Sequence, residues 1–289
     1  MIGVSEVAAS DRLAVRLRRS IGLWGYVAIY LGWAWVFWGA IILSERSVWT
    51  YPNVVLFYLG SLSPTLGGVL MIHRSDGRAG LRELWDRISN LGRIPPRWYL
   101  VILLLYPTLT VVAAGVALLT GTSTRPLDPG SAFERLTNPL SLFAFFGFTL
   151  GAGLVEETGS TGFFLDRLMS IWSPVAAGLI SGAVWASWHI PFFLMEGYYS
   201  QASYQPIVWR FFATFVFLET LYAWVYDNTS RSVLAAILFH LMINLPGEVL
   251  APSQTVRWYT FYLLILVTVV VAVWRRRDTI DVFPSEVES

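Results

Sequence analysis

The chain has 289 residues, of which 55% are hydrophobic and 13% charged, and its mean hydropathy is +0.58. A soluble domain of this length is far less apolar, so the composition predicts a protein that crosses the membrane several times. The net charge of +1 argues against nucleic acid as a partner, and the partner that the composition implies is membrane lipid. No cysteine is present, which excludes disulfides, thiolate metal sites and a cysteine nucleophile.

Apolar runs of about 20 residues, the length that spans a bilayer, predict an all-α polytopic protein of about eight transmembrane helices with an intramembrane cavity. The runs cover residues 22–44, 52–73, 98–119, 140–165, 172–192, 206–226, 231–250 and 256–274. The first run is too long for a cleaved signal peptide, so we interpret it as a retained anchor. A single membrane domain, 22–274, is therefore expected between a cytoplasmic N-terminal segment, 1–21, and a cytoplasmic tail, 275–289. Both extreme termini are expected to be disordered.

The distribution of arginine predicts the orientation, because cytoplasmic loops of membrane proteins carry an excess of positive charge. All 20 basic residues are arginine. With both termini in the cytoplasm, 15 arginines lie inside and 5 outside. The five outside are Arg46, Arg125, Arg135, Arg210 and Arg257. We therefore expect both termini to be cytoplasmic. The membrane is expected to be a prokaryotic plasma membrane, and Arg210 is expected to snorkel toward the outer interface.

The stretch from Gly80 to Arg97 has apolar residues at helical spacing, with charged residues between them. This pattern is typical of a helix that lies in the membrane interface. Pro95 and Pro96 are expected to end it before the next span. A connecting helix with a solvated face and a lipid-binding helix are both compatible with the pattern. The apolar positions are Leu81, Leu84, Trp85, Ile88 and Leu91.

Two adjacent carboxylates, Glu156 and Glu157, stand in the apolar run 140–165. Ionisable groups within a bilayer are costly unless they face a polar interior, so they indicate a functional site. Adjacent residues on a helix point about 100° apart, so the two carboxylates face different surroundings. A carboxylate in a dry pocket is a stronger base than one in water, which makes one of the two a candidate general base. The alternative is a buried pair that stabilises helix packing through hydrogen bonds.

Two of the three histidines, His189 and His240, lie in later apolar runs. Trp185 precedes His189 by four residues, so that the indole can pack beside the imidazole on one helix face. Asn244 follows His240 by four residues, and the two side chains could donate hydrogen bonds to a developing oxyanion. Each spacing alone is also typical of hydrogen-bonded core residues. Carboxylate and imidazole groups on three apolar segments together suggest an intramembrane active site.

In this order, the motifs resemble the CPBP family of intramembrane endopeptidases. The shared pattern is Glu-Glu on one span, aromatic-x-x-x-His on the next and His-x-x-x-Asn on a later span. The family comprises type II CAAX prenyl proteases, bacteriocin-processing and self-immunity proteins, and lysostaphin-resistance-like proteins. The resemblance covers residues 75–250, is strongest from 150 to 245, and includes the turn 226–233 ahead of the last motif.

The resemblance implies roles for four residues. Glu156 would activate the attacking water together with His189, while His240 and Asn244 would stabilise the oxyanion. The substrate would be a peptide or a membrane-anchored protein. The family is often described as metalloproteases, and two histidines with a glutamate can bind a divalent metal such as zinc with an open position. Glu156, His189 and His240 would then be the ligands. Because no His-Glu-x-x-His helix is present, we favour a glutamate-activated water without an obligatory ion.

The chain departs from the family pattern at Thr161. Family members usually pair the second carboxylate, here Glu157, with an arginine at that place, and a buried carboxylate without a partner is costly. Three outcomes are open: a protonated Glu157 hydrogen-bonded to Thr161 or Ser160, an approach by another arginine such as Arg167, or a degenerate site. The first is geometrically the simplest, because Thr161 lies one helical turn from Glu157. Trp185, where the family commonly has Phe, is a milder change.

Two other classes of function are compatible with parts of the sequence. A catalytically inert member of the same fold would act as a membrane scaffold or immunity protein, which the residue at position 161 favours. A small proton-coupled transporter would use Glu156, Glu157 and Glu219 as a relay. No inverted repeat supports transport. Glu219, in the run 206–226, is expected either to line the cavity or to contact a neighbouring helix.

Overall fold

The computed structural model describes residues 4–130, 133, 137–199 and 205–280, and all of the regular elements in these ranges are helices. This confirms the predicted all-α class. The longer helices are α1 (Val4–Leu43), α2 (Asn53–Ser61), α3 (Ser63–Ser89), α4 (Pro96–Leu119), α6 (Pro139–Gly159), α8 (Pro174–Trp188), α9 (Val208–Asn228), α10 (Val233–Val249) and α11 (Gln254–Ile280). The short ones are η1 (Leu91–Arg93), η2 (Ser160–Leu165), α7 (Asp166–Met169) and η3 (Ile190–Phe193).

Six helical segments within the described residues are long and apolar enough to cross a membrane. They are Gly22–Leu43, Asn53–Ser89, Pro96–Leu119, Pro174–Phe193, Val208–Asn228 and Gln254–Arg275. The helices α6 and α10 occupy the two remaining predicted runs, and α10 is a shorter apolar helix of 17 residues. The chain is therefore a polytopic membrane protein, as predicted.

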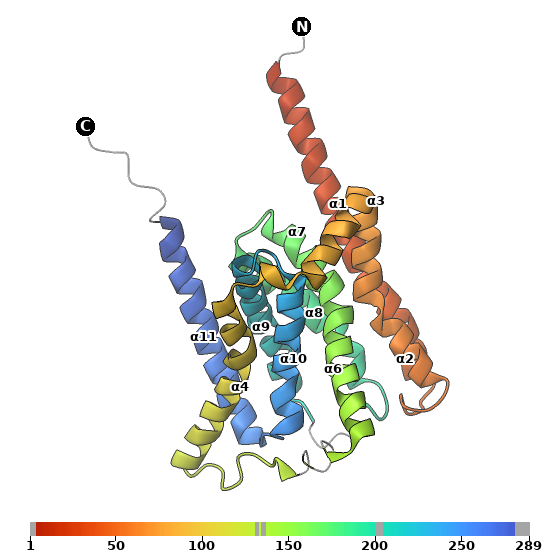
Figure 1. The fold of residues 1–289 in the computed structure, drawn as a ribbon. Coiled ribbons are helices and arrows are strands. Elements are labelled where there is room, and N and C mark those ends of the chain that lie inside the picture. The colour runs from red at the N-terminus through yellow and green to blue at the C-terminus, as the bar shows by residue number, and fades with distance from the viewer. Residues whose placement is uncertain (1–3, 131–132, 134–136, 200–204, 281–289) are drawn as a thin grey trace, which may run out of the picture.

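Both ends of the chain extend further as helix than the sequence patterns predict. The first helix begins at Val4 instead of residue 22, and α11 continues to Ile280. Residues 4–19 are rich in Ala, Leu and Arg, which are good helix formers, and adding residues to an existing helix is far easier than nucleating one. Residues 1–3 and 281–289 of the predicted disordered ends lie outside the described residues. Figure 1 shows the start of α1 and the end of α11 at the same end of the molecule.

The predicted interfacial helix is the second part of α3. The helix is interrupted at Gly77, which has φ +61° and ψ −149°, a conformation that only glycine adopts without strain. After Gly77 the chain turns across the end of the bundle at which the termini lie (Figure 1). Trp85 is exposed there, but Leu84 is buried among the helices. This segment is therefore seated on the bundle, and only part of it faces outward.

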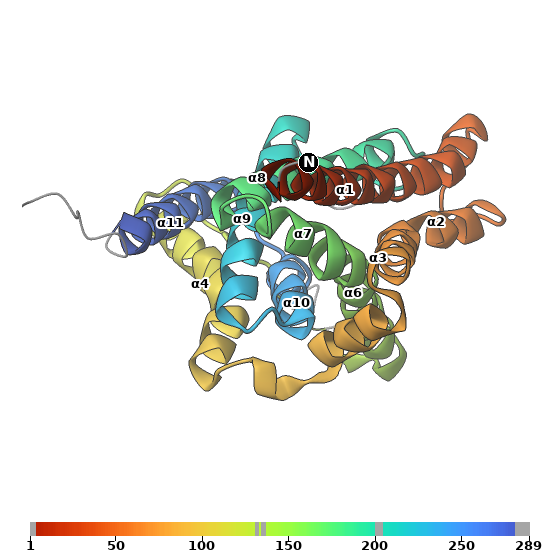
Figure 2. The same ribbon diagram turned by 90° about the horizontal axis from the view of Figure 1, so that it is seen from above.

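The helix α10 lies in the middle of the bundle, where it contacts α4, α6, α9 and α3 (Figure 2). The pair α8 and α9 packs closely because glycines of α8 meet the backbone of α9. A Cβ at Gly178 would lie 2.6 Å from Thr220 Cα, and one at Gly182 would lie 2.6 Å from Val216 Cα. Small residues allow such close approach of helices in a membrane. This packing holds α8, the helix that ends at His189, against α9.

Candidate active site

The helix that carries the two carboxylates is fixed by its contact with α3. A Cβ at Gly68 of α3 would lie 2.6 Å from Gly159 Cα, so the two backbones touch. One turn earlier, Thr65 Oγ1 donates a hydrogen bond to the backbone oxygen of Val155 at 2.5 Å. The stretch from Val155 to Gly159 therefore has little freedom to slide or rotate.

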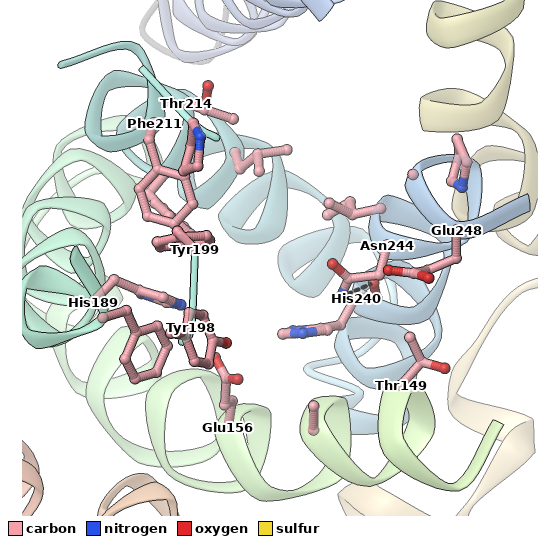
Figure 3. A pocket seen from close by; sticks show the side chains of 18 of the residues that line it. Thr149, Glu156, His189, Tyr198, Tyr199, Phe211, Thr214, His240, Asn244 and Glu248 are labelled. Carbon is pink, nitrogen blue, oxygen red and sulfur yellow. Dashed lines mark hydrogen bonds between the residues drawn. The ribbon is translucent and has the colours of Figure 1, made fainter. Parts of the chain in front are cut away.

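A cavity of about 1900 Å³ is lined by all four residues predicted to be catalytic. Glu156 reaches it from α6, His189 from the end of α8, and His240 and Asn244 from α10. Figure 3 shows Glu156 and His189 on one side of the cavity, facing His240 on the other. The predicted convergence of these side chains is present in the fold.

Glu156 is oriented by a tryptophan. Trp185 Nε1 donates a hydrogen bond to Glu156 Oε2 at 2.8 Å, and edge contacts with Phe215 and Tyr222 hold the buried indole. The other carboxylate oxygen, Oε1, has no hydrogen bond to any described residue and is left for a ligand in the cavity. The sequence predicted that the Trp185 indole packs beside His189, and the centroids of the two rings are 5.9 Å apart. The hydrogen bond from the indole to Glu156 was not predicted.

His189 occupies the C-cap of α8, where its Nδ1 lies 3.0 Å from the backbone oxygen of Trp185. Because a carbonyl oxygen can only accept, Nδ1 carries the proton and a neutral ring presents Nε2 as an acceptor. The ring stacks on Phe215 with 4.4 Å between centroids, and Trp188 packs against it edge-on. Both its tautomer and its orientation are thus set by the protein.

Glu157 points away from the side chain of Glu156, as the angle of about 100° between adjacent helical residues predicts. It is 1% exposed, and its Oε1 lies 2.8 Å from His240 Nδ1. Thr161 Oγ1 donates to Oε2 at 2.6 Å, and Ser160 Oγ lies 3.3 Å from the same oxygen. Arg167 instead pairs with Asp76. Of the first arrangement considered for position 161, the structure shows the hydrogen bond from threonine, and the approach of Arg167 considered second is absent.

His240 connects this buried carboxylate to the cavity. Its Nδ1 faces Glu157 and its ring extends into the cavity (Figure 3). Asn244 Nδ2 donates to the backbone oxygen of His240 at 3.3 Å, which leaves its second amide hydrogen for a ligand. The two donors lie one helical turn apart on the same wall of the cavity, as their spacing predicts.

The cavity also contains residues that the sequence analysis missed. Tyr198, in the segment after η3, points into the cavity near Glu156 (Figure 3). Burial raises the pKa of Tyr198 above its ordinary value, with further contributions from Glu156 and Tyr58, so the hydroxyl stays protonated. This irregular segment has no helical spacing from which the contact could be predicted. Arg210 was expected to snorkel, but it is buried with its guanidinium 4.5 Å from the Trp258 ring centre.

The arrangement does not fit a three-ligand zinc site. Within the described residues, no three His, Asp or Glu side chains come close enough to hold a metal ion. Glu156, His189 and His240 therefore share the cavity without forming a ligand group.

Glu219 is fully buried on α9 and does not belong to the cavity lining. Its backbone oxygen packs against Gly178 of α8, but neither carboxylate oxygen has a hydrogen-bond partner among the described residues. The structure therefore excludes the cavity lining and places Glu219 at the α8–α9 contact, without the side-chain bond that was the other expectation.

These features define an α-helical integral membrane protein with a large cavity that receives carboxylate, imidazole and amide side chains from three helices. Residues 138–246, which contain all three motifs, match the family described as Type II CAAX prenyl endopeptidase Rce1-like. A protein of Methanococcus maripaludis named CAAX prenyl protease 2 is 24% identical over 255 residues, covering 87% of this chain and 92% of that protein. The two matches confirm the predicted resemblance to the CPBP family.

Proposed function

We propose that the chain is an intramembrane endopeptidase of the CAAX-protease type. The observation that carries the proposal is the convergence of Glu156, His189, His240 and Asn244 on one cavity within the membrane domain. The family match and the name of the methanococcal relative support the same class of reaction. Neither the inert scaffold nor the transporter requires this arrangement of a base opposite two hydrogen-bond donors.

The base side of the cavity is formed by Glu156 and His189. A water bound between Glu156 Oε1 and His189 Nε2 would have acceptors for both hydrogens. As its oxygen attacks the peptide carbonyl carbon, Glu156 takes one proton and later gives it to the leaving nitrogen when the C–N bond breaks. Trp185 keeps the carboxylate facing the water through the bond to Oε2.

The oxyanion side is formed by His240 and Asn244. The Glu157 carboxylate at His240 Nδ1 stabilises an imidazolium, whose Nε2–H can donate to the negative oxygen of the tetrahedral intermediate. The free amide hydrogen of Asn244 is a second donor on the same wall. In this mechanism the two adjacent carboxylates differ in role, because Glu156 moves a proton and Glu157 orients and balances a histidine.

The substrate we propose is a peptide or membrane-anchored protein that enters from the bilayer or its interface. Much of the cavity wall near the four residues is aromatic, which suits an apolar chain. The name of the methanococcal relative makes a peptide with a prenylated CAAX terminus the first substrate to test.

The test is cleavage of such a fluorogenic peptide by the purified protein in liposomes, beside its non-prenylated counterpart. We expect Glu156→Gln and His189→Asn to abolish cleavage without changing the unfolding temperature. Glu196→Gln, which alters an exposed carboxylate outside the cavity lining, serves as the matched control. Equal turnover by wild type and Glu156→Gln would contradict the mechanism, and no turnover by the wild type would favour the inert scaffold.

A further inference from the structure

The motif helix ends in an unusual turn directly beyond the two carboxylates. After Gly159, α6 passes into the π-helical turn Ser160–Leu165, and α7 then begins at Asp166. π-Helical turns are rare in proteins, and those that occur are often found at functional sites. Thr161, whose hydroxyl donates to Glu157, is part of this turn. A rotation of the turn would therefore move the carboxylate that faces His240.

One buried arginine from a distant part of the chain binds this turn. Arg87 of α3 is 4% exposed, and its Nη2 donates to the backbone oxygen of Gly162 at 3.0 Å. Its Nη1 donates to the hydroxyl of Tyr226 at 2.6 Å and lies 3.5 Å from Asp166 Oδ1. The guanidinium thus connects the middle of the π-helical turn to its end and to α9.

Asp166 completes the connection as a shared acceptor. It is buried, accepts a hydrogen bond from the Tyr226 hydroxyl at 2.9 Å, and accepts one from Arg231 Nε at 2.7 Å. Arg231 lies just before α10, the helix that carries His240. A buried charge needs such a paired and hydrogen-bonded setting, because removing one partner leaves the other uncompensated. The network therefore fixes α3, the π-helical turn, α9 and the start of α10 to one another.

Side-chain packing holds the same surfaces together. Leu84 and Arg87 are three residues apart on α3, so they lie on one helix face. A Cβ at Gly162 would lie 2.8 Å from Leu84 Cδ1, which shows how closely α3 is seated on the turn. Leu84 and Arg87 both fall in the segment 80–97, which the sequence pattern indicated as an interfacial helix. Their contacts show that this segment also packs against the π-helical turn.

We propose that Arg87 is a positioning residue for the Glu156–Glu157 pair. It holds the π-helical turn through the oxygen of Gly162, and the turn sets Glu157 through Thr161. The substrate does not touch Arg87, which acts through the geometry of the two carboxylates. This inference rests on the proposed peptidase function, and its tests separate the two.

The first test compares two arginines of the same region. Arg87→Gln should lower kcat about 100-fold, the effect of a displacement near 1 Å in a reacting group, with KM unchanged. Arg87→Lys, which keeps the charge but loses the fork geometry, should retain part of the activity. Arg93→Gln is the control, because Arg93 pairs with Glu83 and Asp86 and donates to the backbone oxygen of Ser230, but has no contact with the π-helical turn 160–165. Equal losses in the Arg87 and Arg93 variants would overturn the proposal.

A double-mutant cycle tests whether Arg87 acts through Glu157. Thr161→Val removes the hydroxyl that binds Glu157, so its effect on kcat should overlap with that of Arg87→Gln. Their combined effect should be smaller than the product of the two single effects. Effects that multiply fully would show that Arg87 and Thr161 act independently, which would contradict the positioning role.

Hydrogen–deuterium exchange gives a readout that does not depend on catalysis. Arg87→Gln should increase exchange in residues 156–169 relative to Arg93→Gln, while exchange in α11 stays unchanged. Unaltered protection of residues 156–169 would overturn the proposal even if the wild type cleaves no peptide. Conversely, cleavage that requires Glu156 but proceeds normally in Arg87→Gln would refute the positioning role and leave the proposed function intact.

Discussion

Thr161→Val isolates one hydrogen bond on which both stability and catalysis should depend. The threonine hydroxyl lies 2.6 Å from Glu157 Oε2, and this carboxylate is 1% exposed, so water cannot readily replace the lost donor. Valine preserves the shape of the side chain. A hydrogen bond to a charged group contributes about 1.5–3 kcal/mol, and we expect the free energy of unfolding to fall by that amount. Ser160 compensates little, because it is 3.3 Å away and also donates to the backbone oxygen of Glu156.

The same substitution should slow turnover about tenfold, which corresponds to about 1.4 kcal/mol of transition-state stabilisation lost through a loosened His240. Equilibrium unfolding in mixed micelles and kcat in liposomes measure the two effects. Thr158→Val is the matched control, since Thr158 is also buried but donates to the backbone oxygen of Leu154. Thr161→Ser should restore both quantities. If the valine variants at 158 and 161 behave alike, the reasoning about Glu157 is wrong.

Three further predictions concern the donors, the metal and the orientation. Asn244→Ala should lower kcat about 10²–10³-fold, as expected for the loss of an oxyanion donor, and an unchanged kcat would remove Asn244 from the mechanism. Because the three proposed ligands do not form a metal-binding group, treatment with a strong chelator should leave the cleavage rate unchanged, and a loss restored by zinc would contradict this. The natural absence of cysteine allows single-cysteine labelling: in intact cells an impermeant maleimide should modify Thr124→Cys but not Ser89→Cys, and the opposite pattern would invert the predicted topology.

The motif residues could be predicted because their chemistry conflicts with their surroundings. A carboxylate or imidazole in an apolar run is costly, so Glu156, His189 and His240 were visible without a structure. The angle between adjacent helical residues also predicted that Glu156 and Glu157 would face different partners. The all-α membrane fold followed from the apolar runs alone, although α1 and α11 extend beyond them.

The remaining features depend on contacts between segments far apart in the sequence. No local pattern predicts that the indole of Trp185 binds Glu156, 29 residues away. The burial of Arg87 depends on the break at Gly77 and on Asp166, so the local amphipathic pattern indicated only an interfacial helix. The π-helical turn has no sequence signature of its own, and the packing of Leu84 against Gly162 shows how it is held.

Threonine at position 161 changes what must balance the charge of Glu157. An arginine there, as is usual in the family, would neutralise the carboxylate directly. Threonine supplies a hydrogen bond but no charge, so in the proposed mechanism the charge of Glu157 is balanced by a protonated His240, whose Nδ1 lies 2.8 Å from the carboxylate. The imidazolium that balances Glu157 is also the form of His240 that can donate from Nε2 to an oxyanion. In this chain, stability of the motif helix and stabilisation of the transition state are therefore expected to depend on the same ion pair.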